Sequence, residues 1–590
     1  MSILIDTVRI AGFRGLENIE ISLPRVTVLI GTNNTGKTSV IKALQLALGD
    51  YSRYLTDEDF HIDSNDVRCD QILVDVRIIP IGEDGARQQA FDDDWAQEFG
   101  DKIQAEANGN QFLAMRTVAT PDTVKGGFIV EHYALDQWPE FTAWQDEKTS
   151  KKQQIRRRYD ALPFISIDAQ RDIHQELKDK SSFVGKVLSS IKYDESDVQK
   201  LEEMVAQINQ AAVDKSEPLK GLKKQLDTLN QSFEGTGQAE LTPFPKKIRD
   251  LSKRFSVNYG ETDNSSFSME YHGMGTRSWA SMLTVKAFID LMDSNHEEEA
   301  IPFFPVLTVE EPEAHLHPNA QRTLYQQLIN TNGQVIISTH SPYLAAMSSI
   351  QGLRGLIKNS KGVCATSLMP GLDQEDINIL HREIMRFRGE ILFAKALILF
   401  EGVTEEQLVP AMFERYCGNS AFSIGVNCIS VAGKNYPPFV KFACSFGIPV
   451  CIVSDNDGQT KKEIKAQVKK IKDAGLALDN DIFSLHFLNE NNDIEAELVN
   501  ALNLRDEIVQ ALIATQTRGS TNEHYIVAKT KDIEAMDSEG LLEAMRAAKA
   551  SYAGYLSDVI LRNPNNKETE KLIPDAIVAA FKQIEGWSKS

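Results

Sequence analysis

A phosphate-binding loop at residues 31–38 limits what this 590-residue chain can fold into more than any other part of its sequence. The loop reads GTNNTGKT and fits the pattern GxxxxGK[ST], whose backbone N–H groups cradle phosphate oxygens. It follows the apolar run Val26–Ile30 and precedes a helical pattern over Lys37–Leu48, which is the strand–loop–helix order that this binding mode needs. The sequence therefore predicts an α/β domain that binds a nucleotide and Mg²⁺, with Lys37 at the β- and γ-phosphates and Thr38 at the ion. The residues expected to bind the nucleotide are Asn33, Asn34, Thr35, Gly36, Lys37, Thr38 and Ser39.

Length and composition indicate several folded domains. At roughly 100–200 residues per domain, three or four are expected. The hydrophobic fraction of 42% and the aromatic fraction of 8% suffice to build cores, which excludes a globally disordered chain. The 63 basic and 84 acidic residues give a net charge of −21, which argues against a protein that coats nucleic acid through bulk positive charge. A local basic groove and a carboxylate site for metal ions both stay compatible with this balance.

Cysteine usage and hydropathy favour a cytoplasmic protein. None of the six cysteines forms a CxxC pair, as expected of thiols in a reducing compartment. The first thirteen residues, MSILIDTVRIAGF, read as a strand and lack the pattern of an export signal. No run approaches 18 apolar residues, so no membrane span and no membrane partner are expected.

A second motif that carries chemistry lies far downstream of the loop. The apolar stretch 303–309 runs into Glu310 and Glu311, and paired carboxylates after a strand suit a site for Mg²⁺ and water. The first carboxylate would hold the metal, and the second would orient or deprotonate the attacking water. The motif becomes specific through its full sequence, EEPEAHLHP over residues 310–318, and through the strand 335–338 that follows and ends in Thr339-His340-Ser341.

Together these motifs resemble the ATP-binding-cassette (ABC) ATPases of the SMC/RecF type. The resemblance implies that Glu310 is the Walker B carboxylate, that Glu311 is the catalytic one, and that His340 is the switch histidine facing the γ-phosphate of ATP. Residues 312–317 would form the D-loop.

The same resemblance implies that two copies complete each other's site through a signature loop. The candidate is residues 273–278, which we expect to open a helix at Trp279 and to offer Gly275 and Ser278 to the partner's nucleotide. Its wording departs from the usual LSGGQ, and a simple glycine-rich turn is the alternative. Residues 171–256, with apolar positions at helical spacing, predict a helical insertion between two halves of the ATPase. A dimerisation element is the preferred interpretation of this insertion, and additional helical core is the alternative.

Two short strands in the second half of the chain each end in acids. Strand 396–400 runs into Glu401, and strand 449–453 is followed by Asp455 and Asp457. Parallel strands would bring these carboxylates to the carboxyl edge of one sheet, where open α/β sheets bind ligands. Close carboxylates repel and raise one another's pKa unless a divalent cation neutralises them, and Mg²⁺ or Mn²⁺ prefers such oxygen ligands.

This ordered pair of motifs resembles a Toprim domain. An ABC ATPase followed by Toprim resembles the OLD (overcoming lysogenisation defect) family of nucleases, to which the Gabija defence nuclease subunit belongs. The resemblance implies further acids at Glu405 and at Glu495, with Glu497 as the rival of the latter, and a lysine for which Lys549 matches best. It implies ATP and Mg²⁺ as cofactors, with Mn²⁺ or Ca²⁺ as alternatives at the nuclease site. The resulting catalytic set is Glu311, His340, Glu401, Asp455, Asp457 and Lys549. The expected metal ligands are Thr38, Glu310, Glu401, Glu405, Asp455, Asp457 and Glu495.

The expected architecture is an α/β chain in five parts. Residues 1–170 and 257–385 would form the two parts of an ABC/SMC-like ATPase around the helical dimerisation insertion 171–256. Residues 390–505 would form the Toprim nuclease domain, and residues 506–590 a C-terminal helical region that completes it.

The leading hypothesis is an ATP-regulated, divalent-metal-dependent DNA endonuclease or nickase in anti-phage defence or DNA processing, acting by two-metal phosphodiester hydrolysis. An ATP-gated DNA clamp with a silent Toprim domain and a topoisomerase-like enzyme are the alternatives. We expect a homodimer or higher homo-oligomer, with a helicase-like or other defence-system partner. Two basic runs are candidate DNA contacts: Lys148, Lys151, Lys152, Arg156, Arg157 and Arg158 in the first, and Lys461, Lys462, Lys465, Lys469, Lys470 and Lys472 in the second.

Overall fold

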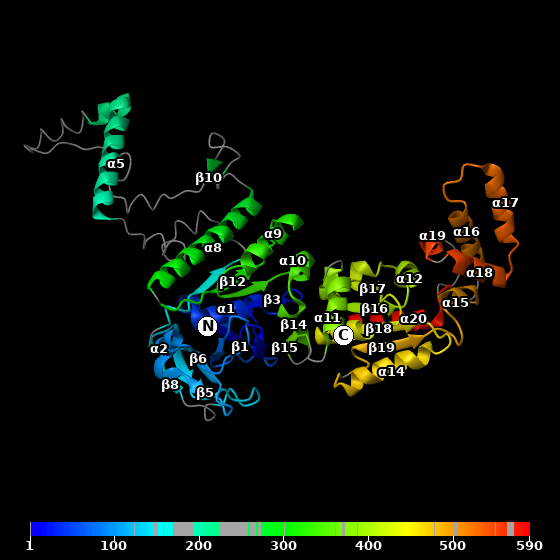
Figure 1. Cartoon of the computed structure of the whole chain (residues 1–590), viewed down its shortest axis with the longest axis horizontal. Coiled ribbons are helices and arrows are strands. Elements are labelled where there is room, and N and C mark those ends of the chain that lie inside the picture. Colours follow the sequence, from blue (N-terminus) through cyan, green and yellow to red (C-terminus); the bar gives the residue numbers. More distant parts are fainter. Residues whose placement is uncertain are drawn as a thin grey trace, which may run out of the picture.

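The computed structural model contains three large β-sheets, two in the half of the molecule that holds the N-terminus and one in the half that holds the C-terminus (Figure 1). The structure describes residues 2–122, 124–146, 152–156, 158–168, 194–223, 258–259, 267–268, 273–299, 301–359, 362–368, 372–385, 388–476, 478–500, 504–548, 550–562 and 572–589. No helix in these ranges is long and apolar enough to cross a membrane.

The first sheet is antiparallel, with the strand order β2-β1-β4-β6-β7-β8 and a short β5 (Gln104–Ala105) beside β6. A β-bulge in β1 between Ile5 and Thr7 shifts the pairing register. The buried side chains accordingly change from odd positions such as Ile3 to even positions such as Val8, and both pack into one core. The strands of this sheet are β1 (Ser2–Phe13), β2 (Leu16–Ser22), β4 (Ile72–Ile81), β6 (Gln111–Pro121), β7 (Phe128–Leu135) and β8 (Lys152–Gln154).

The second sheet is mostly parallel and contains the strands predicted to flank the nucleotide. Its order is β15-β14-β3-β13-β12-β9, and only the β14–β15 pair is antiparallel. Its strands are β3 (Val26–Ile30), β9 (Phe164–Ile167), β12 (Val306–Glu310), β13 (Gln334–Ser338), β14 (Leu353–Asn359) and β15 (Gly362–Ser367).

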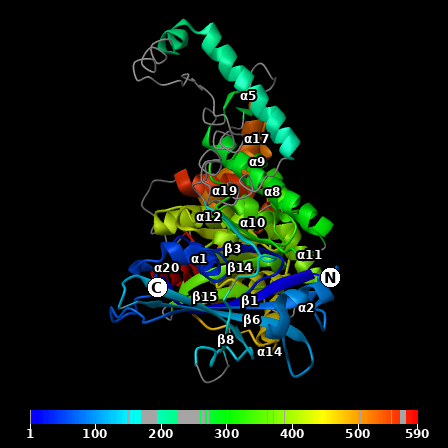
Figure 2. The same cartoon turned by 90° about the vertical axis from the view of Figure 1, so that its left-hand side faces the viewer.

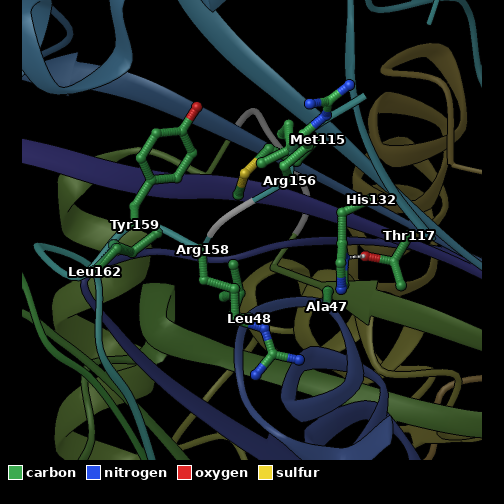
Figure 3. A pocket seen from close by; sticks show the side chains of 10 residues that line it. Ala47, Leu48, Met115, Thr117, His132, Arg156, Arg158, Tyr159 and Leu162 are labelled. Carbon is green, nitrogen blue, oxygen red and sulfur yellow. Dashed lines mark hydrogen bonds between the residues drawn. The ribbon is translucent and has the colours of Figure 1, made fainter. Parts of the chain in front are cut away.

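Helix α1 (Lys37–Leu48) packs between these two sheets. Leu29 of β3 shares the core of α1 and β1, whereas Val28 and Ile30 point to the opposite face, as the two-residue period of a strand requires. That opposite face is covered by α8 (Met274–Glu299), α9 (Pro318–Ile329) and α10 (Pro342–Met347). A cavity of about 180 Å³ lies where the C-terminal end of α1 meets β6 and β7 (Figure 3).

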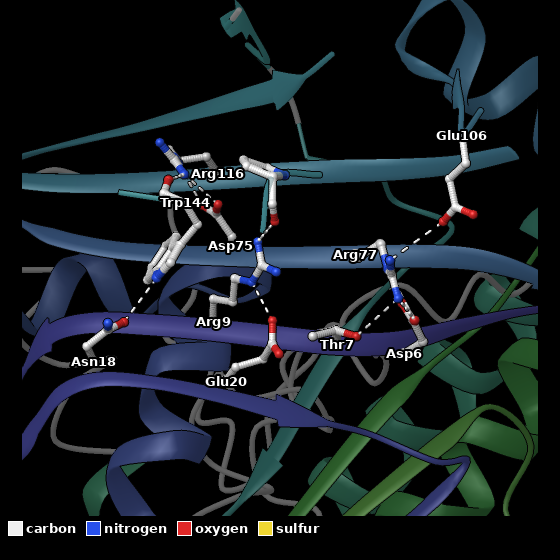
Figure 4. A network of polar contacts seen from close by, with 11 residues as sticks. Asp6, Thr7, Arg9, Asn18, Glu20, Asp75, Arg77, Glu106, Arg116 and Trp144 are labelled. Atoms are coloured by element: carbon white, nitrogen blue, oxygen red, sulfur yellow. Dashed lines mark hydrogen bonds and ion pairs between the residues drawn. The ribbon is translucent and has the colours of Figure 1, made fainter. Parts of the chain in front are cut away.

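A ladder of charged side chains crosses the antiparallel sheet on its other face (Figure 4). Arg9 lies opposite Glu20 on one neighbouring strand and Asp75 on the other, and Asp75 lies opposite Arg116. Arg116 Nε donates to Asp75 Oδ1 at 2.7 Å and Nη2 to Oδ2 at 2.6 Å, while Nη2 also donates to the carbonyl of Trp144. Both side chains are fully buried, so the ion pair with Asp75 is what compensates the charge of Arg116 in this interior.

The third sheet is parallel throughout, in the order β17-β16-β18-β19, with helices on both faces. Its strands are β16 (Ala396–Phe400), β17 (Val426–Ser430), β18 (Val450–Ser454) and β19 (Phe483–Phe487). One face packs against α12 (Val403–Cys417) and α20 (Asp575–Lys589), and the other against α13 (Pro437–Ser445) and α14 (Thr460–Asp473). The remaining helices, on the outer side in Figure 1, are α15 (Ile494–Asn500), α16 (Arg505–Gln516), α17 (Glu523–Glu534), α18 (Ser538–Ala548) and α19 (Ser551–Arg562).

One continuous hydrophobic core connects the second sheet to the third. Between them lie α11 (Gln374–Leu380) and the short helices η8 (His381–Met385) and η9 (Gly389–Phe393). An ion pair joins Lys441 Nζ of α13 to Asp376 Oδ2 of α11 at 2.9 Å. A second joins Arg388 Nη2 to Glu406 Oε1 of α12 at 2.9 Å.

Most predicted elements are confirmed, and α1 and β16 match their predicted bounds. Of the predicted insertion 171–256, the described part is chiefly α5 (Glu195–Lys215), which stands away from the sheets in both views (Figures 1 and 2). Most of the insertion lies outside the described residues, and its role in dimerisation stays a prediction. The predicted helix start at Trp279 is wrong, because α8 already begins at Met274.

Candidate nucleotide and nuclease sites

The phosphate-binding loop has the backbone geometry that its sequence predicted. Gly36 takes a φ of 89° as it caps α1, and its missing side chain leaves room for Leu16, whose Cδ2 lies 2.7 Å from where a Cβ would be. Lys37 Nζ donates to the carbonyls of Gly31 at 2.9 Å and Thr32 at 2.8 Å. Burial lowers the pKa of Lys37 to about 8, and the charges of Glu311 and Glu313 oppose that shift. The loop therefore holds a partly desolvated cation where phosphates would bind.

Glu310 ends β12 beside the start of α1. Its carboxyl is almost fully buried and takes a hydrogen bond from Thr38, which brings together the two expected Mg²⁺ ligands of this site. Burial raises the pKa of Glu310, and Lys42, whose Nζ lies 3.5 Å from Oε1, opposes this shift.

Asp168 is a neighbour of this site that the sequence reasoning missed. It follows β9, the strand paired with β12, and its Oδ1 lies 2.6 Å from Lys42 Nζ. Its charge adds to the burial that raises the pKa of Glu310. The sequence signal that could have identified Asp168 is the one that identified Glu310 and Glu401, an apolar strand that ends in an acidic residue.

Glu311 and His340 face each other across the ends of β12 and β13. Glu311 has a φ of 44°, its N–H donates to the Ser338 carbonyl at 2.9 Å, and its Oε1 lies 3.8 Å from His340 Nε2. Burial and the nearby Lys37 lower the pKa of His340, while Glu311 and Glu313 oppose the change. The imidazole is therefore biased toward its neutral form beside the predicted catalytic carboxylate.

Glu313 is a second residue whose contacts the sequence reasoning missed, although it placed the residue in the D-loop. Its Oε1 accepts from Thr339 Oγ1 at 2.8 Å, from the His340 N–H at 2.7 Å and from the Ser341 N–H at 3.1 Å. One carboxylate oxygen thus ties the predicted D-loop to the segment that carries the predicted switch histidine.

The two predicted signature residues lie in the first turns of α8. A Cβ on Gly275 would lie 2.4 Å from the carbonyl oxygen of His315, so only glycine allows this close approach to the D-loop. Ser278 is 3% exposed within its own chain. Their contact with a second copy stays a prediction.

The acids of the third sheet come together as their strand positions predicted. Glu401 follows β16 and Asp455 follows the adjacent parallel strand β18, and Ser454 Oγ donates to Glu401 Oε1 at 2.9 Å. Glu405 is buried in the first turn of α12. Burial, followed by repulsion from Glu495 and Glu401, raises the pKa of Glu405 to about 7.

Asp455 has the more strongly perturbed carboxyl of the pair. Burial raises its pKa to about 8, and Glu405, Glu401, Asp493 and Asp457 add to the shift in that order. Burial and one another's charge thus keep a substantial protonated fraction on two side chains that are normally ionised at pH 7.

The structure distinguishes the two rival acids of α15. Glu495 has a pKa raised by burial and accepts from Tyr552 OH at 3.2 Å. Glu497 is turned away and satisfies the loop before the helix: Asn489 Nδ2 donates to its Oε1 at 2.7 Å, and Asn492 Nδ2 to its Oε2 at 2.6 Å. Glu495 therefore lies with the cluster, and Glu497 holds the loop.

Asp457 is exposed, and its Oδ1 accepts from Thr460 Oγ1 at 2.5 Å at the start of α14. The second basic run lies on α14 itself, where Lys461 Nζ sits 5.5 Å from the centre of the Phe487 ring. Lys549 and, from the first basic run, Lys148, Lys151 and Arg157 lie outside the described residues, so their roles stay predictions.

The carboxylate cluster fits a divalent cation in its chemistry. Among the described residues, no three histidine, cysteine or acidic side chains are already arranged around a single ion position. The raised pKa values of Glu405 and Asp455 show, however, that this cluster carries an electrostatic cost that an ion bound to oxygen ligands would remove.

Comparisons with known proteins agree with this division into two catalytic units. The family model of the AAA ATPase domain matches residues 4–79 and 101–345, more than half of the chain. The model of the overcoming lysogenization defect protein-like TOPRIM domain matches residues 392–457.

Two curated relatives extend over both units. The OLD nuclease of Thermus scotoductus is 24% identical in an alignment of 487 positions that covers 77% of this chain and 82% of that protein. The endonuclease GajA of Bacillus cereus strain VD045 is 22% identical over 470 residues, 78% of this chain and 75% of the relative. Among solved structures, the C-terminal region of the Xanthomonas campestris OLD protein matches with 22% identity and a TM-score of 0.25, covering 34% of this chain and 96% of that one. The chain belongs to the AAA ATPase domain family and joins that ATPase to an OLD-like TOPRIM domain, which is the composition of an OLD family nuclease.

Proposed function

We propose that this protein is an ATP-regulated, divalent-metal-dependent DNA endonuclease or nickase that serves anti-phage defence or DNA processing. The observation that carries the proposal is the cluster of Glu401, Glu405 and Asp455, whose pKa values are all raised by burial and by neighbouring carboxylates. Such a cluster lowers the stability of the folded protein unless a cation occupies it. Carboxylates that destabilise the fold in this way are typical of a catalytic site.

At the nuclease site, Mg²⁺, Mn²⁺ or Ca²⁺ would be held by Glu401, Glu405, Asp455, Asp457 and Glu495. The bound metal would polarise a phosphodiester and lower the pKa of water. Ser454 orients Glu401, and Tyr552 orients Glu495, through the hydrogen bonds that each donates. Because Glu405 and Asp455 must lose their protons to bind metal, metal binding releases protons below about pH 8.

DNA would reach this edge along α14, whose lysines begin four residues after Asp457. We propose that these lysines bind the phosphate backbone, with Lys549 stabilising charge on the scissile phosphate as the family resemblance implies.

In the ATPase, Lys37 and Thr38 would bind the phosphates and Mg²⁺ together with Glu310, while Glu311 activates water and His340 senses the γ-phosphate. A second copy would contribute Gly275 and Ser278, so the active species would be a homodimer or higher homo-oligomer.

Regulation by ATP is supported by a packed path between the sites. Helix α10 begins two residues after His340, and η9 packs against it so closely that a Cβ on Gly389 would lie 2.5 Å from the Pro342 carbonyl oxygen. Strand β16 begins three residues after the end of η9 and leads to Glu401. The Arg388–Glu406 ion pair connects the same junction to α12, the helix of Glu405. A shift of the His340 segment on ATP binding would therefore move the strand and helix that carry two of the carboxylates.

The test is cleavage of supercoiled plasmid with Mg²⁺ or Mn²⁺, with and without ATP. Wild type should nick or linearise the plasmid, and Glu401→Ala and Asp455→Ala should abolish this, whereas Glu414→Gln, an exposed position at the far end of α12, should not. Lys37→Ala should remove the effect of ATP and leave metal-dependent cleavage. Intact DNA with persistent ATPase activity would instead favour a clamp, and a changed linking number without nicks would favour a topoisomerase-like enzyme.

A further inference from the structure

The cavity beside α1 has a position and lining that neither the ATPase nor the nuclease explains. It is bounded by Ala47 and Leu48 at the end of α1, Thr117 of β6, His132 of β7 and Arg156 after β8 (Figure 3). Lys37, at the phosphate loop, lies ten residues away at the other end of this helix, roughly 15 Å along its axis at 1.5 Å per residue. The cavity is therefore separate from the site expected for the phosphates of ATP.

Its inner lining combines apolar surface with neutral hydrogen-bonding groups. Ala47, Leu48 and Met115 supply apolar contacts, and His132 Nδ1 lies 3.0 Å from Thr117 Oγ1. Burial, followed by the nearby Arg158, lowers the pKa of His132 to about 4, so the ring is neutral at physiological pH and can exchange hydrogen bonds with a neutral ligand.

Two arginines, Arg156 and Arg158, also line the cavity. Within the part of the chain that the structure describes, neither Arg156 nor Arg158 forms an ion pair within 4.0 Å. Burial lowers the pKa of Arg158, Arg53 adds to that effect and Asp50 opposes it. Glu98 and Asp101 act on Tyr159, whereas Arg158 has the neighbours Asp50 and Arg53. The end of the cavity that carries Arg156 and Arg158 therefore favours an anionic group.

The size of the cavity limits what the anionic group can be attached to. An apolar cavity of about 150 Å³ holds a benzene-sized ring, and the cavity here is about 180 Å³. A planar nucleobase fits such a volume, whereas a whole nucleotide does not. Tyr159, which also lines the cavity, presents an aromatic surface of the kind on which bases stack.

We propose that this cavity binds one nucleotide unit, with its base against the apolar lining, His132 and Tyr159, and its phosphate on Arg156 and Arg158. The same chemistry is offered by a free nucleoside monophosphate and by an unpaired nucleotide of a DNA strand. The site stands independently of the nuclease assignment, because no carboxylate of the third sheet contributes to it.

The test is equilibrium binding to full-length protein that carries Lys37→Ala, so that the phosphate loop does not contribute. The probes are thymidine monophosphate, thymidine, inorganic phosphate and a twelve-nucleotide oligothymidylate. We expect the monophosphate or the oligonucleotide to bind at least about tenfold more tightly than thymidine or phosphate alone, because base and phosphate each add contacts. Binding of the monophosphate assigns the site to free nucleotides. Binding of the oligonucleotide alone assigns it to a strand if the cavity variants below weaken it, because the α14 lysines also offer contacts to DNA.

Two further variants in this background test the two halves of the cavity. Arg156→Ala with Arg158→Ala should weaken binding at least about tenfold, and Ala47→Leu, which fills the apolar part without changing charge, should do the same. Arg518→Ala, an exposed arginine on the α16–α17 turn, is the matched control and should bind as the background does. Equal affinity for phosphate and thymidine monophosphate, or unchanged affinity in the cavity variants with unchanged melting temperatures, would overturn the proposal.

Discussion

Replacing Asp455 by asparagine should abolish nuclease activity and, at the same time, stabilise the metal-free protein. The pKa of Asp455 rises from an ordinary 3.8 to about 8 through burial and the repulsion of Glu405 and Glu401. At 1.36 kcal/mol per pKa unit, keeping this side chain in its folded surroundings near pH 7.5 costs about 5 kcal/mol relative to the unfolded chain. Asparagine keeps the shape and removes the charge.

We expect about 2–3 kcal/mol of this cost to be recovered, because Glu405 shares the repulsion and part of the site is solvated. At about 2–4 °C per kcal/mol for a domain of this size, the melting temperature should rise by roughly 5–10 °C at pH 7.5 without metal. The sign follows from the raised pKa: Asp455 costs no stability below pH 3.8, and its cost grows as the pH rises toward about 8. The gain in the variant should therefore be roughly half as large at pH 5.5 as near pH 8.

Thermal unfolding across that pH range, with and without Mg²⁺, tests the reasoning. Mg²⁺ should stabilise wild type and have little effect on Asp455→Asn. The matched control is Asp457→Asn, because Asp457 is exposed and hydrogen-bonded to Thr460, so its replacement should give no stabilisation. A variant Asp455→Asn that melts at or below the wild-type temperature at pH 8, or whose gain does not grow with pH, would refute the electrostatic account.

Three further predictions concern the fold, the ATPase and its link to the nuclease. Asp75→Asn should lower the free energy of unfolding by about 3 kcal/mol, measured in urea, because it leaves the buried Arg116 charge unmatched; a loss below 1 kcal/mol would show that Arg116 finds another partner. Glu313→Ala should lower the kcat of ATP hydrolysis at least about tenfold with little change in KM, because three hydrogen bonds that hold the His340 segment disappear; an unchanged kcat would remove this role. Gly389→Val should leave ATPase activity within about twofold while it changes the ratio of cleavage rates with and without ATP, because a Cβ there collides with the backbone of α10; an unchanged ratio would place the coupling elsewhere.

Local sequence patterns were sufficient to predict a site wherever its residues lie within a short stretch of chain. The phosphate loop follows from a strand, glycines at fixed offsets and a helix, all within residues 26–48. The positions of Glu401 and Asp455 follow from strand ends, because neighbouring parallel strands present their carboxyl ends at one edge. The choice of Glu495 over Glu497 came from the family resemblance, and the hydrogen bonds of the two side chains now give it a physical reason.

Contacts between distant segments could not be read from these patterns, because the partners are separated by long stretches of chain and each looks ordinary alone. Glu313 gains its role only where it meets the His340 segment, and Asp168 only where Lys42 and Glu310 lie beside it. The sequence placed Gly275 in a loop, but in the structure it lies in helix α8. Its close packing against the D-loop explains why a glycine stands in that helix. The sequence determined which residues could do chemistry and at which strand ends they stand. Tertiary packing decided which of these residues share a desolvated environment. Burial and the charges of neighbouring groups set the pKa values on which the proposed chemistry depends, and neither can be read from a linear pattern.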